Sequence, residues 1–214
     1  NSIHLQRWAI GLAERGLRVS VITQQGPEAL PLPSSIELHV LPFRGGAGYV
    51  LNALALRRLL HTLRPDLLHA HYASGYGTTA MLARWHPWLL SVWGADVYDF
   101  PEKSALHRAL LRQNLQRADR LASTSMAMAN QVRRIWPEAG PIYITPFGVD
   151  TERFCPGAAA TQRELTIGTV KSLAPKYGVD TLIRAFARLV EAGAGVDARL
   201  LIVGGGPQRA ALES

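Results

Sequence analysis

Short apolar runs alternate with longer amphipathic stretches along the whole chain. Runs such as "PDLLHAH" and "RLLIV" are rich in Leu, Ile and Val and are bounded by turn residues, which is typical of strands buried on both faces. We expect strands at 18–23, 36–41, 66–71, 88–92, 119–123, 142–145, 165–170 and 199–203. Between them apolar positions recur with the period of helices, which we expect near 3–15, 49–64, 76–85, 103–117, 126–135, 179–192 and from 207 onward.

This alternation predicts an α/β fold, a doubly wound parallel sheet with right-handed crossovers. The stretch 150–165 lacks apolar periodicity and contains Pro156 and Gly157, which indicates a linker. We therefore expect two Rossmann-like domains, 1–156 and 157–214. Because both ends interrupt the alternation, we expect a segment of a longer protein that lacks the first strand and most of the second domain, and that is inactive on its own.

Composition narrows the partners. The net charge of +7 and the pI near 10.1 favour a negatively charged binding partner. The arginines are scattered, however, and no basic–aromatic tract indicates nucleic-acid binding. No apolar run reaches the length of about 18 residues that suggests a membrane span. The single Cys155 excludes an intramolecular disulfide and fits the cytoplasm.

The stretch "PDLLHAHYASGYG" carries the first candidate residues. His69 and His71 share one face of a strand, and His71 lies at its carboxyl end, where ligands bind in such sheets. Gly75 follows in the next loop. No third ligand follows at a suitable spacing, so we expect no metal. A structural role is the simpler interpretation of His69, whereas a structural and a functional role both stay open for His71.

Two further loops follow strands at the same predicted edge. "SVWGADVYDF" presents Asp96 and Asp99 on one loop rather than across a cleft, which is not the arrangement of a glycosidase pair. Asp96 could instead cap a helix or form an Asx turn. "ITPFGVDTERF" places Gly148 and Asp150 on a loop that leads into the linker.

The second domain offers candidate anion-binding groups. Lys171 and Lys176 lie on one loop at a strand end and can converge on a diphosphate, although two exposed surface lysines are the alternative. "GGGPQR" places backbone N–H groups, with that of Gly206 among them, at a helix N-terminus. The G-x-G-x-x-G fingerprint fails at Arg209 and no Gly-Lys-Ser/Thr exists, so dinucleotide and Walker-loop sites are excluded.

Taken in order, these stretches resemble the retaining nucleotide-sugar glycosyltransferases of glycosyltransferase family 4, which have the GT-B fold. The resemblance covers nearly the whole chain and is nearest to members that build bacterial surface polysaccharides. It implies that His71 is catalytic and contacts the donor sugar, and that Lys171, Lys176 and Gly206 bind the donor diphosphate. It also places Gly75, Asp96, Gly148 and Asp150 on the acceptor side or in the cleft.

The implied reaction moves a sugar, with retention, from a nucleotide-diphosphate donor to a glycan or lipid-linked acceptor, without metal or other cofactor. Lys171 stands where most members have Arg, and Phe147 replaces a frequent Asn. A sugar-nucleotide 2-epimerase and a non-catalytic GT-B partner subunit stay open as alternatives. We expect a cytoplasmic protein. A contact with the anionic inner face of the plasma membrane is one interpretation of the following basic and aromatic residues, and a solvated basic face is the alternative: Phe43, Arg44, Tyr49, Arg57, Arg58, His61 and Arg64.

Overall fold

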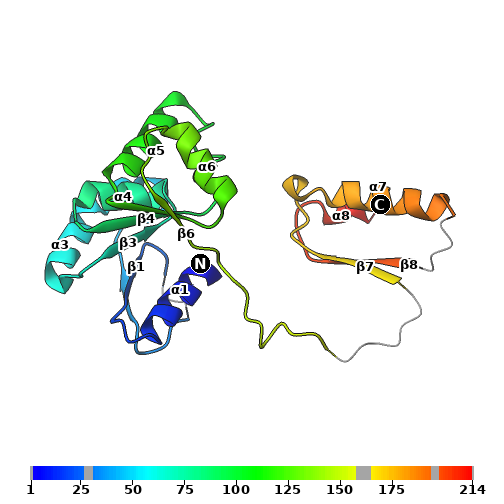
Figure 1. Ribbon diagram of the computed structural model, residues 1–214, viewed down its shortest axis with the longest axis horizontal. Helices are drawn as coiled ribbons and strands as arrows, with labels where there is room; N and C mark the ends of the chain where they lie inside the picture. Colours follow the sequence, from blue (N-terminus) through cyan, green and yellow to red (C-terminus); the bar gives the residue numbers. More distant parts are fainter. Residues whose placement is uncertain (1, 27–30, 158–164, 194–197, 214) are drawn as a thin grey trace. The chain divides into compact units, whose positions relative to one another are not determined.

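The computed structural model describes residues 2–26, 31–157, 165–193 and 198–213 (Figure 1). The chain divides into two compact units, 1–149 and 150–214. The division falls at the start of the predicted linker, of which 158–164 lie outside the described residues.

The first unit alternates strands with helices. Its strands are β1 (Ser20–Thr23), β2 (Glu37–Val40), β3 (Leu68–His71), β4 (Trp88–Val92), β5 (Arg120–Ser123) and β6 (Ile142–Ile144). Its helices are α1 (Ile3–Ala13), α2 (Gly45–Leu51), α3 (Ala53–Leu63), α4 (Gly75–Ala83), α5 (Ala105–Arg117) and α6 (Met126–Ile135). All the predicted strands are present, and every pairing is parallel, as expected.

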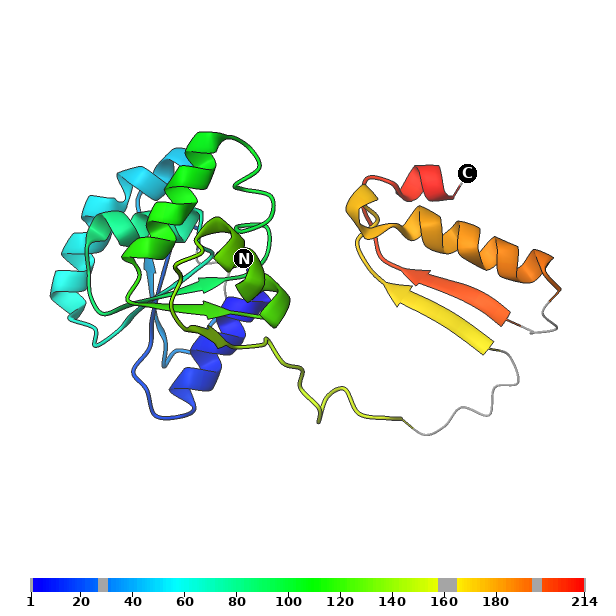
Figure 2. The ribbon, with the colours of Figure 1, turned by 45° about the horizontal axis from the view of Figure 1, so that its top comes forward.

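The strands of the first unit form two separate sheets rather than one. β3, β4, β5 and β6 pair in that order, while β1 pairs with β2 alone, and no ladder among the described residues joins β1 to β3. Helices α3, α4 and α5 lie on one side of the larger sheet and α1 lies on the other (Figures 1 and 2). This two-sided cover is the doubly wound arrangement that the sequence predicts.

One predicted helix is different in the structure. Residues 49–64 were expected to form a single helix, but α2 already begins at Gly45, and Asn52 separates α2 from α3. The Asn52 side chain accepts from Phe43 N at 3.0 Å and donates to Phe43 O at 2.7 Å. A Cβ at Gly48 would lie 2.6 Å from the same carbonyl oxygen, so only glycine permits this close packing.

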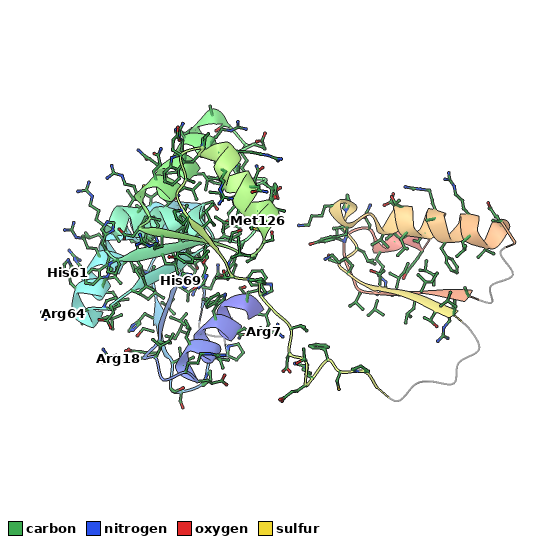
Figure 3. All side chains as sticks on the ribbon, viewed as in Figure 1. Arg7, Arg18, His61, Arg64, His69 and Met126 are labelled. Atoms are coloured by element: carbon green, nitrogen blue, oxygen red, sulfur yellow. The ribbon has the colours of Figure 1, made fainter. Side chains whose placement is uncertain are left out.

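The core of the first unit joins β4 to α5. Trp88, Leu90 and Val92 of β4 pack with Leu111 and Leu115 of α5, and none is more than 1% exposed. The register pairs His71 with Ser91, so the carboxyl ends of β3 and β4 meet at one edge of the sheet. In Figure 3 the labelled His69 lies inside the unit, whereas Arg18, His61 and Arg64 lie at its periphery.

The second unit is a single βαβ arrangement. β7 (Leu165–Val170) and β8 (Ala198–Val203) pair in parallel, and α7 (Val179–Glu191) lies along one face of the pair (Figure 2). A 3-10 turn, η2 (Pro175–Tyr177), precedes α7, and α8 (Arg209–Leu212) follows the glycine turn. None of the helices that the structure describes is both long enough and apolar enough to cross a bilayer.

Candidate functional site

Aromatic rings from four parts of the first unit gather at the carboxyl edge of the larger sheet. They are His69 and His71 of β3, Trp93 after β4, Phe147 after β6, and His4 and Trp8 of α1. The His4 and Phe147 rings stack with their centroids 3.6 Å apart, and Trp93 meets Phe147 edge-on at 5.3 Å. Phe147 therefore has a packing role here.

His69 and His71 are both held neutral. Their rings lie 3.9 Å apart, and the Trp8 ring contacts both of them. Burial lowers the pKa of His69 to about 4, and burial together with the neighbouring His69 lowers the pKa of His71 well below its usual value. Both imidazoles are therefore uncharged at neutral pH.

The two histidines differ in their hydrogen bonds. His69 Nε2 lies 2.7 Å from Ser91 Oγ, which agrees with a structural role. His71 Nδ1 is buried and has no hydrogen-bond partner among the described residues. His71 thus keeps an unused polar atom at the functional edge of the sheet, and its catalytic role stays a prediction.

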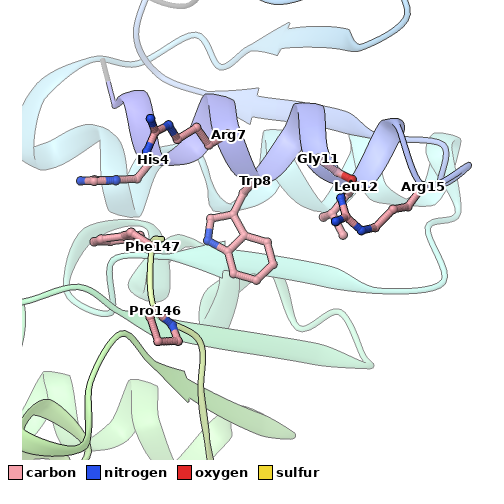
Figure 4. Close-up of a pocket in the computed structure, with 8 residues that line it drawn as sticks. All are labelled: His4, Arg7, Trp8, Gly11, Leu12, Arg15, Pro146 and Phe147. Carbon is pink, nitrogen blue, oxygen red and sulfur yellow. Dashed lines mark hydrogen bonds between the residues drawn. The ribbon is translucent and has the colours of Figure 1, made fainter. Parts of the chain in front are cut away.

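A hollow of about 220 Å³ opens beside the aromatic rings (Figure 4). It is lined by one face of α1 and by the loop after β6: His4, Arg7, Trp8, Gly11, Leu12, Arg15, Pro146 and Phe147. Trp8 connects it to the histidine pair because the same ring also contacts His71. The predicted site residues themselves do not line this hollow.

Asp96 ties two loops of the sheet edge together. It is completely buried, and its carboxylate accepts from Gly94 N at 2.7 Å, from Trp93 N at 3.1 Å and from Ala73 N at 2.7 Å. Burial raises the pKa of Asp96, and these backbone hydrogen bonds oppose that rise. Its bonds go to residues that precede it, so Asp96 forms neither the helix cap nor the Asx turn considered from the sequence.

Gly75 begins α4 beneath the Tyr49 ring. A Cβ there would lie 2.5 Å from Tyr49 Cζ, so the close approach of the ring requires glycine. The Tyr49 ring also meets Tyr76 edge-on at 5.3 Å. Gly75 therefore packs α4 against α2, and its predicted role on the acceptor side stays untested.

Gly148 and Asp150 lie at the division between the units. Gly148 has a φ of 68°, which favours glycine, and Asp150 Oδ1 accepts from Glu152 N and Arg153 N at 3.1 and 3.0 Å. Both residues are exposed and both shape the turn there. Their predicted role in a cleft stays a prediction.

The second unit brings both lysines to one aromatic ring. Lys171 Nζ and Lys176 Nζ lie 4.5 and 5.0 Å from the centroid of Tyr177. A hollow of about 390 Å³ at the carboxyl ends of β7 and β8 is lined by Lys171, Tyr177 and the glycine turn among others. No described carboxylate forms an ion pair with either lysine, so their charges are available to an anion.

The glycine turn after β8 packs closely against the loop that carries the two lysines. A Cβ at Gly204 would lie 1.9 Å from Lys171 O, and one at Gly206 would lie 2.4 Å from Leu173 O. Gly204 and Gly205 line the hollow, whereas Gly206 packs against Leu173, and α8 begins later than expected, at Arg209. Diphosphate binding by Gly206 stays a prediction.

Sequence reasoning missed some residues of these sites and left others unplaced. Trp8 reads only as part of the apolar stripe of a helix, and Tyr177 has no motif of its own. Trp93, a further residue of the first site, was also not singled out. Position was the available signal for two of the three, because Trp93 directly follows a strand and Tyr177 directly follows a candidate lysine. Within the described residues, no three His, Cys, Asp or Glu side chains gather in a group that could hold a metal ion.

Comparison with known proteins adds curated relatives. The chain is 26% identical over 238 residues to a D-inositol 3-phosphate glycosyltransferase of Nocardia farcinica, which covers 95% of this chain and 53% of the relative. It is 30% identical over 254 residues to a D-inositol 3-phosphate glycosyltransferase of Nocardiopsis dassonvillei, with 95% and 56% covered. The chain thus spans about half the length of these relatives.

Among solved structures, a chain in the crystal structure of accessory secretory proteins 1, 2 and 3 of Streptococcus pneumoniae covers 73% of this chain and 30% of its own length. Its identity is 16% and its TM-score 0.47, a likeness too slight to bear on function.

The family comparison covers most of the first unit. Residues 1–125 match a protein family described as "Glycosyl transferase 4-like". This region contains α1, the histidine pair and Asp96. The parallel, two-sided α/β arrangement agrees with the Rossmann-type domains of a GT-B fold. Because the match spans more than half of the sequence, the chain belongs to the glycosyl transferase 4-like family.

Proposed function

We propose that the protein is a retaining glycosyltransferase that moves a sugar from a nucleoside-diphosphate donor to a hydroxyl of a glycan or lipid-linked acceptor in cell-surface polysaccharide synthesis. The observation that carries the proposal is the hollow of the second unit at the carboxyl ends of β7 and β8, which Lys171, Tyr177 and the glycine turn help to line. Lys176 does not line it, but its Nζ lies 5.0 Å from the centroid of the Tyr177 ring. The carboxyl ends of the strands are the usual ligand position in an α/β sheet.

The lysines suit the departure of a diphosphate. As the bond from the anomeric carbon to the diphosphate oxygen breaks, negative charge grows on the leaving group. The bond to the acceptor oxygen forms, and the acceptor proton passes to the leaving diphosphate. Two fixed ammonium groups stabilise that charge more in the transition state than in the ground state. Because Tyr177 contacts both ammonium groups, it would hold them in position.

The state of His71 sets what it can contribute. Because the lowered pKa keeps His71 uncharged at neutral pH, it would contact the donor sugar as a neutral hydrogen-bonding group. It supplies no positive charge, and the lysines would carry that part of catalysis. Asp96 accepts three backbone N–H groups and is not placed as a nucleophile.

Replacing the lysines tests the proposal. In the protein at its full length, Lys176→Ala should cost about 2–4 kcal/mol of transition-state stabilisation, a fall in kcat/KM of about 30-fold to 1000-fold. Lys103→Ala removes the third lysine of the printed sequence, which lies in the first unit, and is the control. The acceptors to be screened include D-inositol 3-phosphate, after the relatives, and lipid-linked sugars.

Three results would count against the proposal. Activity of Lys176→Ala within threefold of the wild type would remove the role of this lysine. Conversion of the free nucleotide sugar to an epimer without acceptor would favour an epimerase. Donor binding without any turnover, together with tight association with another glycosyltransferase, would favour a non-catalytic subunit.

We further propose that the first unit rests on an anionic membrane through one face of α2 and α3, called here the α2–α3 face. Val50, Leu51 and Leu54 are each more than half exposed, and Arg57, Arg58 and His61 continue the same face at helical spacing. Phe43 is also exposed at its start. Apolar side chains followed by cationic ones suit a headgroup layer of acidic lipid.

Vesicle sedimentation separates this contact from general surface charge. We expect Leu54→Glu to weaken binding to acidic vesicles at least fivefold, while Leu106→Glu, which alters a still more exposed leucine on α5, leaves it unchanged. Salt should weaken the binding because charge contributes to it. Equal binding to neutral vesicles, or an equal effect of both substitutions, would refute the membrane contact.

A further inference from the structure

A polar side chain occupies the core-facing stripe of α5. Asn114 lies between Leu111 and Leu115 in this stripe, and all three residues are 0% exposed. An amide buried among leucines destabilises the fold unless its hydrogen bonds are made. The position of Asn114 therefore calls for an explanation other than packing.

The amide nitrogen of Asn114 binds the loop that follows β3. Asn114 Nδ2 lies 2.8 Å from Ala73 O, 2.9 Å from Thr78 Oγ1 and 3.3 Å from Ser74 O. Asn114 Oδ1 is buried and has no partner among the described residues. The fold thus tolerates one unpaired oxygen to supply donors to this loop.

Asp96 binds the same residue from another element. Asp96 Oδ2 accepts from Ala73 N at 2.7 Å, so the N–H and the C=O of Ala73 are both bound by completely buried side chains. Asp96 follows β4 and Asn114 belongs to α5. The two side chains form a clamp on Ala73, called here the Ala73 clamp.

The residue before the clamp has a strained backbone. Tyr72 has a φ of 77°, a left-handed conformation that bulky residues rarely adopt. Such strain persists only where the surroundings enforce it, and it gathers at functional sites. Tyr72 directly follows His71, so the strain lies at the functional end of β3.

We infer that Asn114 and Asp96 are positioning residues for the proposed transfer reaction. They act through the backbone, since the Ala73 clamp forces Tyr72 into its left-handed conformation and thereby fixes the direction in which the loop after His71 leaves the sheet. The inference rests on the proposed function only for its catalytic consequence. The clamp itself is testable without any substrate.

Hydrogen exchange and turnover together test the inference in the full-length protein. Asn114→Leu keeps the branched shape of the side chain, although leucine is larger, and removes the donors, so the amides of 72–78 should exchange at least tenfold faster and kcat/KM should fall at least tenfold. Leu115→Val, on the same stripe but without a bond to the loop, should raise exchange throughout the unit and leave kcat/KM within threefold. Asn114→Asp regains one donor when protonated, so its kcat/KM relative to wild type should rise as pH falls, unlike that of Asn114→Leu.

A second substitution tests the strain directly. Glycine adopts a φ of 77° freely. The double variant Asn114→Leu, Tyr72→Gly should therefore exchange the amides of 72–78 at least threefold more slowly than Asn114→Leu alone. Unchanged exchange at 72–78 in Asn114→Leu, or a loosened loop with unchanged turnover, would overturn the inference. If the wild type shows no transfer at all, the proposed function fails, while exchange still decides the clamp.

Discussion

The contact between Gly75 and Tyr49 predicts that Gly75→Ala destabilises the protein when residue 49 is Tyr, but not when it is replaced by Ala. In Gly75→Ala the new Cβ would lie 2.5–2.8 Å from three atoms of the Tyr49 ring, closer than any real contact. The ring must therefore leave its place between α2 and α4. When the ring moves, its edge-on contact with Tyr76 is lost, which lowers the free energy of unfolding by about 0.5–1.5 kcal/mol. The total loss from overpacking, this contact included, should be about 1–3 kcal/mol.

Thermal unfolding measures this cost. For a protein of this size, about 2 kcal/mol corresponds to a fall in Tm of about 4–8 °C. In a Tyr49→Ala background the obstacle is gone, and Gly75→Ala should then be neutral or stabilising by about 0.5 kcal/mol, because alanine is the better helix former. A wild-type Tm for Gly75→Ala, or an equal loss in both backgrounds, would refute the packing role of Gly75.

Two further predictions concern stability. His69 has a pKa of about 4 against 6.5 in the unfolded chain, so about 3 kcal/mol of stability present above pH 6.5 should be lost as pH falls toward 4. Melts across this range should show the loss, and His69→Gln should make it smaller, while the part that comes from the lowered pKa of His71 stays. An unchanged slope in His69→Gln would contradict this. Gly204→Ala should unfold the second unit because its Cβ would meet Lys171 O at 1.9 Å, whereas Gly205→Ala, with nothing within 4 Å, should melt like the wild type. Equal melting of both variants by circular dichroism would count against it.

The sequence predicts elements well where the information is local. The strands 88–92 and 165–170 are found at those residues, because apolar runs bounded by turn residues depend on near neighbours only. The predicted helix at 49–64 was wrong at its start, because the glycine segment packs against Gln24, far away in the sequence, and this tertiary contact overrides the low helix propensity of glycine. The separation of β1 and β2 from the larger sheet is likewise a matter of long-range pairing.

The candidate site was predictable as a set of loops and not as a set of contacts. His71, Asp96 and Lys171 were found because each follows a strand, and the carboxyl ends of parallel strands meet at one edge. What each side chain touches was not predictable, since one partner of Asp96 is Ala73, far away in the sequence. Asn114 reads from the sequence as one polar residue on a helix, and only its complete burial distinguishes it.

Donor turnover by the Lys171 variant tests the central claim most directly. The measurement is release of nucleoside diphosphate from a panel of UDP- and GDP-sugars by the full-length protein, in the presence of acceptor. Lys171 stands over Tyr177 at the hollow of the second unit, so we predict turnover of at least one donor and a fall in kcat/KM of about 30-fold to 1000-fold in Lys171→Ala, with Lys171→Arg retaining most activity. Turnover by Lys171→Ala within threefold of the wild type, or no turnover of any donor by the wild type, would contradict the account.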